Sequence, residues 1–98
     1  MIATDATLTK AQCGKLAGIG HDGLARAINP VHTMFDGDTM SAMSTCAGAP
    51  VDELTFQAML APAGDGVTRA VARAVVAADS AGGMRGYRDA FPSALRPV

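Results

Sequence analysis

The sequence predicts an α+β fold in which two main helices pack on one small sheet. Three observations predict it. Apolar residues recur at helical spacing in residues 9–28 and again in residues 67–78, and short stretches of apolar and β-branched residues occur in residues 1–6 and 39–45. No internal repeat and no domain boundary interrupts the 98 residues, so we expect a single unit.

The first element expected is the end of a β-strand in residues 1–6. Ile2, Ala3 and Thr4 are apolar or β-branched, and Asp5 then ends the run. A strand of typical length, about 5–6 residues, would need further residues before Met1. We therefore expect this strand to begin upstream of the sequence.

Thr9 is the expected N-cap of a helix that runs to about Ile28, because a Thr hydroxyl can accept a hydrogen bond from a free N–H of the first turn. Asn29-Pro30 ends this helix, since the residue before a proline disfavours the helical conformation. Its glycines cost about 1 kcal/mol each relative to Ala. Packing against a sheet must therefore stabilise it, through a face made of Cys13, Leu16, Ala17, Gly20, Leu24 and Ile28.

The middle of the chain is expected to hold a loop, a strand and a second loop. The loop spans residues 31–38, with a turn at Gly37. A strand of mixed polarity follows in residues 39–45, and residues 46–52 form the next loop because they contain a glycine and a proline. This order places the strand directly after the loop that contains Gly37.

Residues 54–60 fit either a helix or a strand, and Pro62, Gly64 and Gly66 are expected to interrupt the structure that follows. The second main helix is predicted in residues 67–78. Its apolar stripe is made of Val67, Ala70, Val71, Ala74, Val75 and Ala78.

Two features are expected to end the chain's regular structure. Gly82-Gly83 should stop the second helix, because glycine readily adopts the left-handed conformation found just after helices. The tail from Met84 contains Pro92 and Pro97 and is expected to be irregular.

Composition limits the classes of partner. The net charge is −1 and no block of basic residues occurs, so nucleic acid is not an expected partner. Arg or Gly interrupts each apolar stretch well before the roughly 20 residues that a membrane helix needs. No secretory signal is visible, and Cys13 and Cys46 have no closely spaced partner, so we expect a cytoplasmic location and reduced cysteines.

The core is expected to be small. The hydrophobic fraction is 49%, but it consists mostly of Ala, Val, Leu and Met, with four aromatic residues. Small side chains bury little area each, and burial stabilises by only about 25 cal/mol per Å². We therefore expect another segment or chain to complete the core.

The densest polar cluster lies between His32 and Thr39. Asp36 and Asp38 are separated by Gly37, and their carboxylates can point toward one pocket if the turn is tight. Such a pair could hold a positive charge, or repulsion could raise the pKa of one member. From these residues alone, a plain Asp-Gly turn remains the alternative.

Two other kinds of site are alternatives to the acidic pair. Metal ligands could come from His21, Asp22 and His32 together with the two aspartates, but the spacing matches no known ligand pattern. We expect no metal and no other cofactor, and we expect His32 to bond the backbone near the loop.

A serine or cysteine nucleophile is the second of these alternatives. Ser41, Ser44 and Thr45 lie outside the G-x-S-x-G context that exposes a nucleophile at a sharp turn. Cys46 paired with His32 is conceivable, but a buried and inert thiol is favoured.

Several stretches resemble one family. They are ATDA at residues 3–6, LTKAQ at 8–12, HDGLARAI at 21–28 and PVHTMFDGDT at 30–39, in the family's order and spacing. Together they resemble the C-terminal part of the L-aminopeptidase/D-esterase family typified by DmpA, which includes β-peptidyl aminopeptidases and nylon-oligomer hydrolases. Residues 71–89 are similar to the family's closing helix and tail.

The resemblance implies an αββα sandwich made as one precursor, which cleaves itself before a Ser or Thr. That residue becomes the N-terminal nucleophile of the smaller subunit, and its own amine can serve as general base. Residues 1–98 would be a single C-terminal fragment that corresponds to this subunit. The fragment would form a partial sandwich layer, incomplete without the upstream segment, and the nucleophile would fall just before Met1.

The resemblance also implies the site and the partners. Asp36 and Asp38 would be the acidic pair that supports the nucleophile and its amine, whose pKa is about 8. The partners would be the larger upstream subunit or segment, a homo-oligomer, and a small peptide, amide or ester substrate in the intact enzyme. Membrane and nucleic acid are not expected partners.

The expected function is therefore that of an N-terminal-nucleophile aminopeptidase, or amidase-esterase, in the form of a fragment that is inactive alone. Without the nucleophile, the other catalytic groups of the site cannot accelerate the reaction, because they act only together with it. Two alternatives stay open: a complementing subunit of a split hydrolase, and a non-catalytic structural or binding domain.

Overall fold

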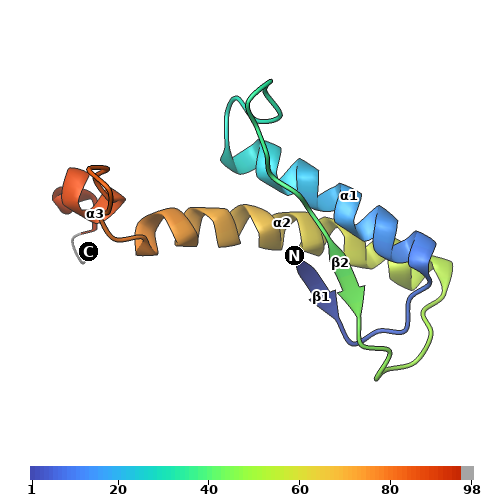
Figure 1. Ribbon diagram of the computed structural model, residues 1–98. Helices are drawn as coiled ribbons and strands as arrows, with labels where there is room; N and C mark the ends of the chain where they lie inside the picture. The colour runs from blue at the N-terminus through green and yellow to red at the C-terminus, as the bar shows by residue number, and fades with distance from the viewer. Residues whose placement is uncertain (96–98) are drawn as a thin grey trace.

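The computed structural model describes residues 1–95 and has the predicted α+β fold, with two main helices packed against a small sheet. Both long helices lie on the same side of the two-stranded sheet (Figure 1). The elements in chain order are β1 (Ile2–Thr4), α1 (Lys10–Ala27), β2 (Ala42–Ser44), α2 (Glu53–Ala77), α3 (Tyr87–Ala90) and a 3₁₀ helix (Pro92–Leu95).

The two strands are parallel and α1 forms the crossover between them. Ile2 pairs with Ala42 and Thr4 with Ser44, and the Ile2 N–H donates to the Ser41 carbonyl at 2.9 Å. Parallel strands require such a crossover, which a single helix supplies. Both strands fall inside the predicted ranges but have three residues each.

Helix α1 begins and ends where the sequence predicts. The Thr9 hydroxyl accepts a hydrogen bond from the Gln12 N–H at 3.1 Å, and the Gln12 side chain accepts one from the Thr9 N–H at 2.9 Å. This reciprocal pair is a capping box. Ile28 is the C-cap and is exposed, whereas Leu16, Gly20 and Leu24 of the predicted face are buried.

Replacement of Thr9 by Ala is expected to lower the free energy of unfolding by about 1 kcal/mol, the usual effect of losing an N-cap hydroxyl. Urea unfolding followed by circular dichroism measures this difference. Thr45→Ala is the control, because the exposed Thr45 hydroxyl makes no hydrogen bond to another described residue. Equal losses in the two variants would contradict the capping role.

Helix α2 runs without interruption through Pro62, Gly64 and Gly66, so the predicted break is wrong, and residues 54–60 are helical. The Asp52 carboxylate starts the helix by accepting a hydrogen bond from the Thr55 N–H at 2.7 Å. Contact with α1 explains why α2 continues through these residues, since tertiary packing commonly overrides helix propensity. The Thr68 hydroxyl lies at this contact, within 2.9 Å of the Gly23 carbonyl and 3.1 Å of the Gly64 carbonyl.

The two long helices cross where Gly23 meets Gly64, and both glycines are buried. A Cβ atom added to Gly23 would lie 2.5 Å from the Gly64 carbonyl oxygen and 2.8 Å from Val67 Cβ. Glycine is therefore needed at Gly23 for the close approach of α2. Gly20 does face the sheet side, where a Cβ would collide with the end of the Met40 side chain and contact Ile2.

The core is small and the molecule is extended. Its radius of gyration is 16.5 Å, against about 12.6 Å for a compact chain of this length. Its accessible surface is 7037 Å², against about 5200 Å² for a typical folded protein of this mass. Among the described residues the buried apolar side chains are those of Leu8, Leu16, Leu24 and Leu60.

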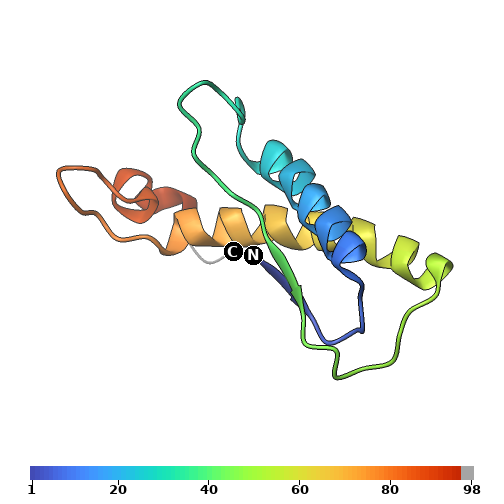
Figure 2. The ribbon, with the colours of Figure 1, turned by 45° about the vertical axis from the view of Figure 1, so that its right-hand side comes forward.

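Much apolar surface therefore remains uncovered within residues 1–95. The C-terminal half of α2 extends away from the sheet together with α3 (Figure 2). In the predicted stripe of this half, Val67 and Val71 are half-buried, but Ala70, Ala74 and Val75 are exposed. Neither long helix has the length and hydropathy needed to cross a bilayer.

The tail is less irregular than predicted. Helix α2 ends at Ala77, before the glycine pair, and Gly82 and Gly83 instead form a turn with positive φ. The short α3 packs near the end of α2, where Arg88 pairs with Asp79 at 2.7 Å. Pro97 lies outside the described residues.

Candidate functional site

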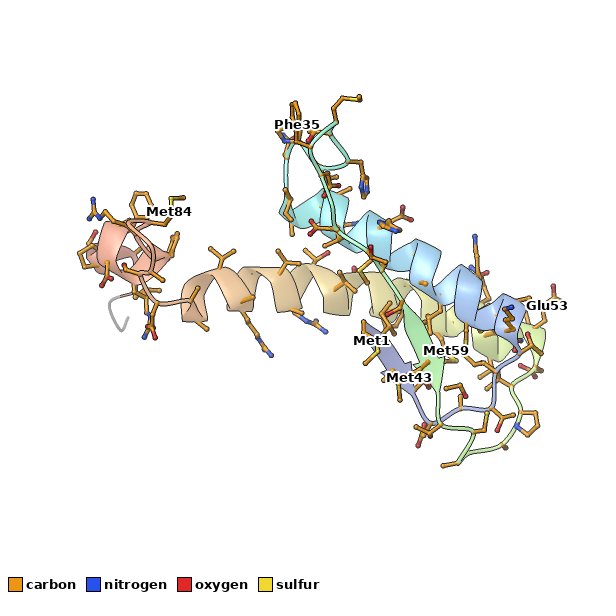
Figure 3. All side chains as sticks on the ribbon, viewed as in Figure 1. Met1, Phe35, Met43, Glu53, Met59 and Met84 are labelled. Atoms are coloured by element: carbon orange, nitrogen blue, oxygen red, sulfur yellow. The ribbon has the colours of Figure 1, made fainter. Side chains whose placement is uncertain are left out.

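The loop between α1 and β2 carries both predicted site residues. It projects beyond the end of α1, and Phe35 lies at its tip (Figure 3). The Asp36 N–H donates to the Thr33 carbonyl at 3.2 Å, so the turn falls at Met34–Phe35 and not at Gly37. Phe35 is fully exposed, at 100%, and Met34 is 93% exposed.

The Asp36 carboxylate organises this loop. Its Oδ2 atom accepts a hydrogen bond from the His32 N–H at 2.9 Å and lies 3.2 Å from His32 Nδ1. Its Oδ1 atom accepts a hydrogen bond from the Asp38 N–H at 3.1 Å. Only 15% of this side chain is exposed, whereas the His32 side chain is 43% exposed. The Asp36 carboxylate is therefore held by the loop that carries it.

These hydrogen bonds lower the pKa of Asp36, and the N–H of Asp38 contributes most. Partial loss of water around the carboxyl opposes this lowering, and the ring and N–H of His32 add to it. Because the pKa is lower in the folded chain, the stabilisation is complete above the ordinary carboxyl pKa. It is lost as the pH falls through the lowered value.

The structure brings Asp36 and Asp38 together. The backbone N–H of Asp38 donates to the Asp36 carboxylate at 3.1 Å, so the two residues are held next to each other in the loop. Asp38 is exposed, whereas Asp36 is partly buried. The two members of the predicted pair therefore have different surroundings.

The sheet register relates this loop to the start of β1. Ser41 accepts the hydrogen bond of the Ile2 N–H, and Asp38 lies three residues before Ser41. If this parallel register were extended, a residue added before Met1 would lie alongside Met40, and earlier residues alongside Thr39 and then Asp38. The acidic pair thus lies toward the end of the sheet at which β1 begins.

The other candidates have different surroundings. Cys46 is exposed and not buried as expected, and it follows the far end of β2, whereas His32 precedes the near end, so the two are not brought together. The Ser44 hydroxyl donates to the Ala6 carbonyl and accepts from the Leu8 N–H at 3.3 Å, which is a structural role. No group of three or more metal-ligating side chains occurs within residues 1–95.

One contact was missed in the sequence. The His32 ring was expected to bond the backbone, but it contacts the Asp36 carboxylate instead, and it lies edge-on to His21 of α1, with ring centroids 5.0 Å apart. The signal in the sequence is the spacing of four residues between His32 and Asp36.

Together, the fold and the loop define a partial α+β layer with a carboxylate pair near the leading end of its first strand. The sequence pattern of peptidase family S58 matches residues 1–89. The chain therefore belongs to peptidase family S58.

Curated relatives agree with this assignment. The chain is 42% identical over 106 residues to uncharacterised aminopeptidases of Mycobacterium tuberculosis and Mycobacterium bovis, and the match covers 97% of this chain and 31% of each relative. An uncharacterised aminopeptidase of Mycobacterium leprae is 39% identical, with 97% of this chain and 29% of the relative covered. The chain thus spans about a third of the length of these relatives.

Proposed function

We propose that this chain supplies the acidic pair of an aminopeptidase-type hydrolase that removes N-terminal residues from small peptides, amides or esters. The enzyme would be of the L-aminopeptidase/D-esterase kind, with an N-terminal Ser or Thr nucleophile. One observation carries the proposal: the Asp36–Asp38 loop lies near the end of the sheet where β1 begins. A nucleophile just before β1 would be placed next to this loop.

The chemistry follows from charge and position. A terminal amine with a pKa of about 8 is mostly protonated at neutral pH. The exposed Asp38 carboxylate could hold this ammonium group and orient it, and Asp36 would support the loop. The deprotonated amine could then take the proton of the nucleophile's hydroxyl during attack on the scissile carbonyl.

A larger segment would complete both the site and the core. Exposed apolar surface favours this interpretation: a hollow of about 260 Å³ beside the start of β1 is lined by Met1, Leu24, Met40, Val67, Ala70, Val71 and Ala74. Upstream residues that continued β1 could fill it. This surface also supports the second candidate, a subunit of a split hydrolase, because such a segment can come from the same polypeptide or from another.

We also propose that residues 1–98 correspond to the smaller subunit of the family and are inactive in isolation. A symmetric oligomer of paired subunits would be the working form. A cytoplasmic location is proposed as well, since Cys13 and Cys46 are both free thiols.

A chimera tests the proposal. This chain replaces the matching region of the Mycobacterium tuberculosis relative, and release of p-nitroaniline from alanine p-nitroanilide is measured. We expect turnover by the chimera and none by residues 1–98 alone, because only the chimera combines nucleophile and acidic pair. The unmodified relative is the reference. Turnover by the isolated chain, or a folded and inactive chimera beside an active reference, would contradict the proposal.

A further inference from the structure

We propose that His32 is a positioning residue of the hydrolytic site, which fixes Asp36 and thereby leaves Asp38 as the carboxylate that binds the terminal amine. The inference rests on the function proposed above and deepens it, because it names the residue that holds Asp36 in its supporting role.

The hydrogen bonds of Asp36 carry the first step. Three donors converge on this carboxylate: the His32 N–H, the His32 ring and the Asp38 N–H, at 2.9, 3.2 and 3.1 Å. Both oxygen atoms are therefore engaged within the loop, and only 15% of the side chain is exposed. A carboxylate used in this way is a structural anchor with little capacity left for an outside ammonium group.

The surroundings of Asp38 carry the second step. Its N–H is one of the donors to Asp36, which fixes the backbone at the point where the Asp38 side chain leaves it. The side chain itself is exposed. An exposed carboxylate on an anchored backbone suits the capture of a positive charge, since the geometry is set before the ligand arrives.

The backbone of His32 carries the third step. Its φ is +57°, in the left-handed region, which is uncommon for residues other than glycine even though histidine, asparagine and aspartate adopt it more often than most. Such strain persists where the surrounding contacts maintain it. Here the contacts are the Asp36 carboxylate on one side and the His21 ring on the other, at a centroid distance of 5.0 Å and an interplanar angle of 65°.

The His21 ring acts in this arrangement by packing. Its Nδ1 atom is buried and has no hydrogen-bond partner among the described residues. It therefore supports His32 as a neighbouring ring on α1 and not as an acceptor.

For the contact to Asp36, Nδ1 of His32 must carry a proton, which is true of the charged ring and of one neutral tautomer.

Two variants with the same backbone freedom test the role of the ring. His32→Gly accepts the left-handed conformation but has no side chain, whereas His32→Asn accepts it and offers an amide N–H near the position of Nδ1. In the isolated chain, we expect the Asp38 N–H to exchange with solvent about 10- to 100-fold faster in His32→Gly, as befits the loss of a hydrogen bond to a charged group. In His32→Asn, the rate should stay within about threefold of the unsubstituted chain. Nitrogen NMR of the unsubstituted chain should show a proton on His32 Nδ1.

Turnover of alanine p-nitroanilide by the chimera supplies the second readout. We expect kcat to fall about 10- to 100-fold in His32→Gly with a smaller change in KM, and we expect His32→Asn to restore most of it. An unprotonated Nδ1, or equal exchange rates in all three chains, would overturn the inference whatever the activity. Unchanged kcat in His32→Gly, beside a loss in Asp38→Asn, would overturn it and leave the proposed function standing. An inactive unsubstituted chimera with the expected exchange rates would instead count against the proposed function.

Discussion

Asp38→Asn in the chimeric hydrolase is expected to lower kcat/KM for alanine p-nitroanilide by about 10²- to 10⁴-fold, the usual contribution of a general base, because the terminal amine that acts as the base loses the carboxylate that positions it. Asparagine has nearly the same shape as aspartate but carries no negative charge, so it cannot hold an ammonium group in the same way. The Asp38 N–H remains in the variant and still donates to Asp36, so the loop should keep its conformation. The loss would then report on charge and not on folding.

The matched control is Asp22→Asn, which removes one carboxylate from the exposed surface of α1. Its kcat/KM should stay within about twofold of the unsubstituted chimera, as for most surface changes. Gel analysis of precursor cleavage accompanies both assays, and turnover is expressed per cleaved subunit. Comparable activity in Asp38→Asn and Asp22→Asn would remove Asp38 from the proposed site.

Gly23→Ala is expected to lower the free energy of unfolding by about 3 kcal/mol, at the upper end of the usual effect of overpacking. The new methyl group would lie 2.5 Å from the Gly64 carbonyl oxygen and 2.8 Å from Val67 Cβ, and the first of these is a backbone atom that cannot rotate away. The two helices would have to separate, and they form the largest contact in the molecule. Urea unfolding followed by circular dichroism measures the change.

Gly18→Ala provides the control in the same helix. A Cβ atom there meets nothing within 4 Å, so the variant should gain about 0.5–1 kcal/mol from the lower conformational freedom of alanine. The two substitutions add the same methyl group five residues apart and are expected to change stability in opposite directions. Similar stabilities in both variants would show that the helices do not depend on close approach at Gly23.

Local signals in the sequence predicted local structure well. The Thr9 cap, the end of α1 at Asn29-Pro30 and the two short strands depend on neighbouring residues and could be inferred from them. The continuity of α2 could not. Pro62 and Gly64 are helix-breaking by propensity, and only the contact with α1, which lies far away in sequence, explains why the helix continues.

The site was predicted in part, for a similar physical reason. Resemblance to a family assigned Asp36 and Asp38, and a hydrogen bond from the Asp38 N–H to the Asp36 carboxylate holds them together, although their catalytic role stays a prediction. The turn at Met34–Phe35 and the bond from His32 to Asp36 were not foreseen. They accompany a left-handed conformation at His32, which is uncommon for any residue other than glycine and which the neighbouring sequence does not signal.

The sheet of residues 1–95 consists of two strands, so each strand keeps one side without a neighbour among the described residues. Those free sides present unpaired N–H and carbonyl groups, which any extended peptide can join. The order in which other strands reach these free sides during synthesis therefore matters. Complementary strands that fold nearby would occupy these positions first, whereas a chain released alone at high concentration would meet copies of itself and begin to aggregate.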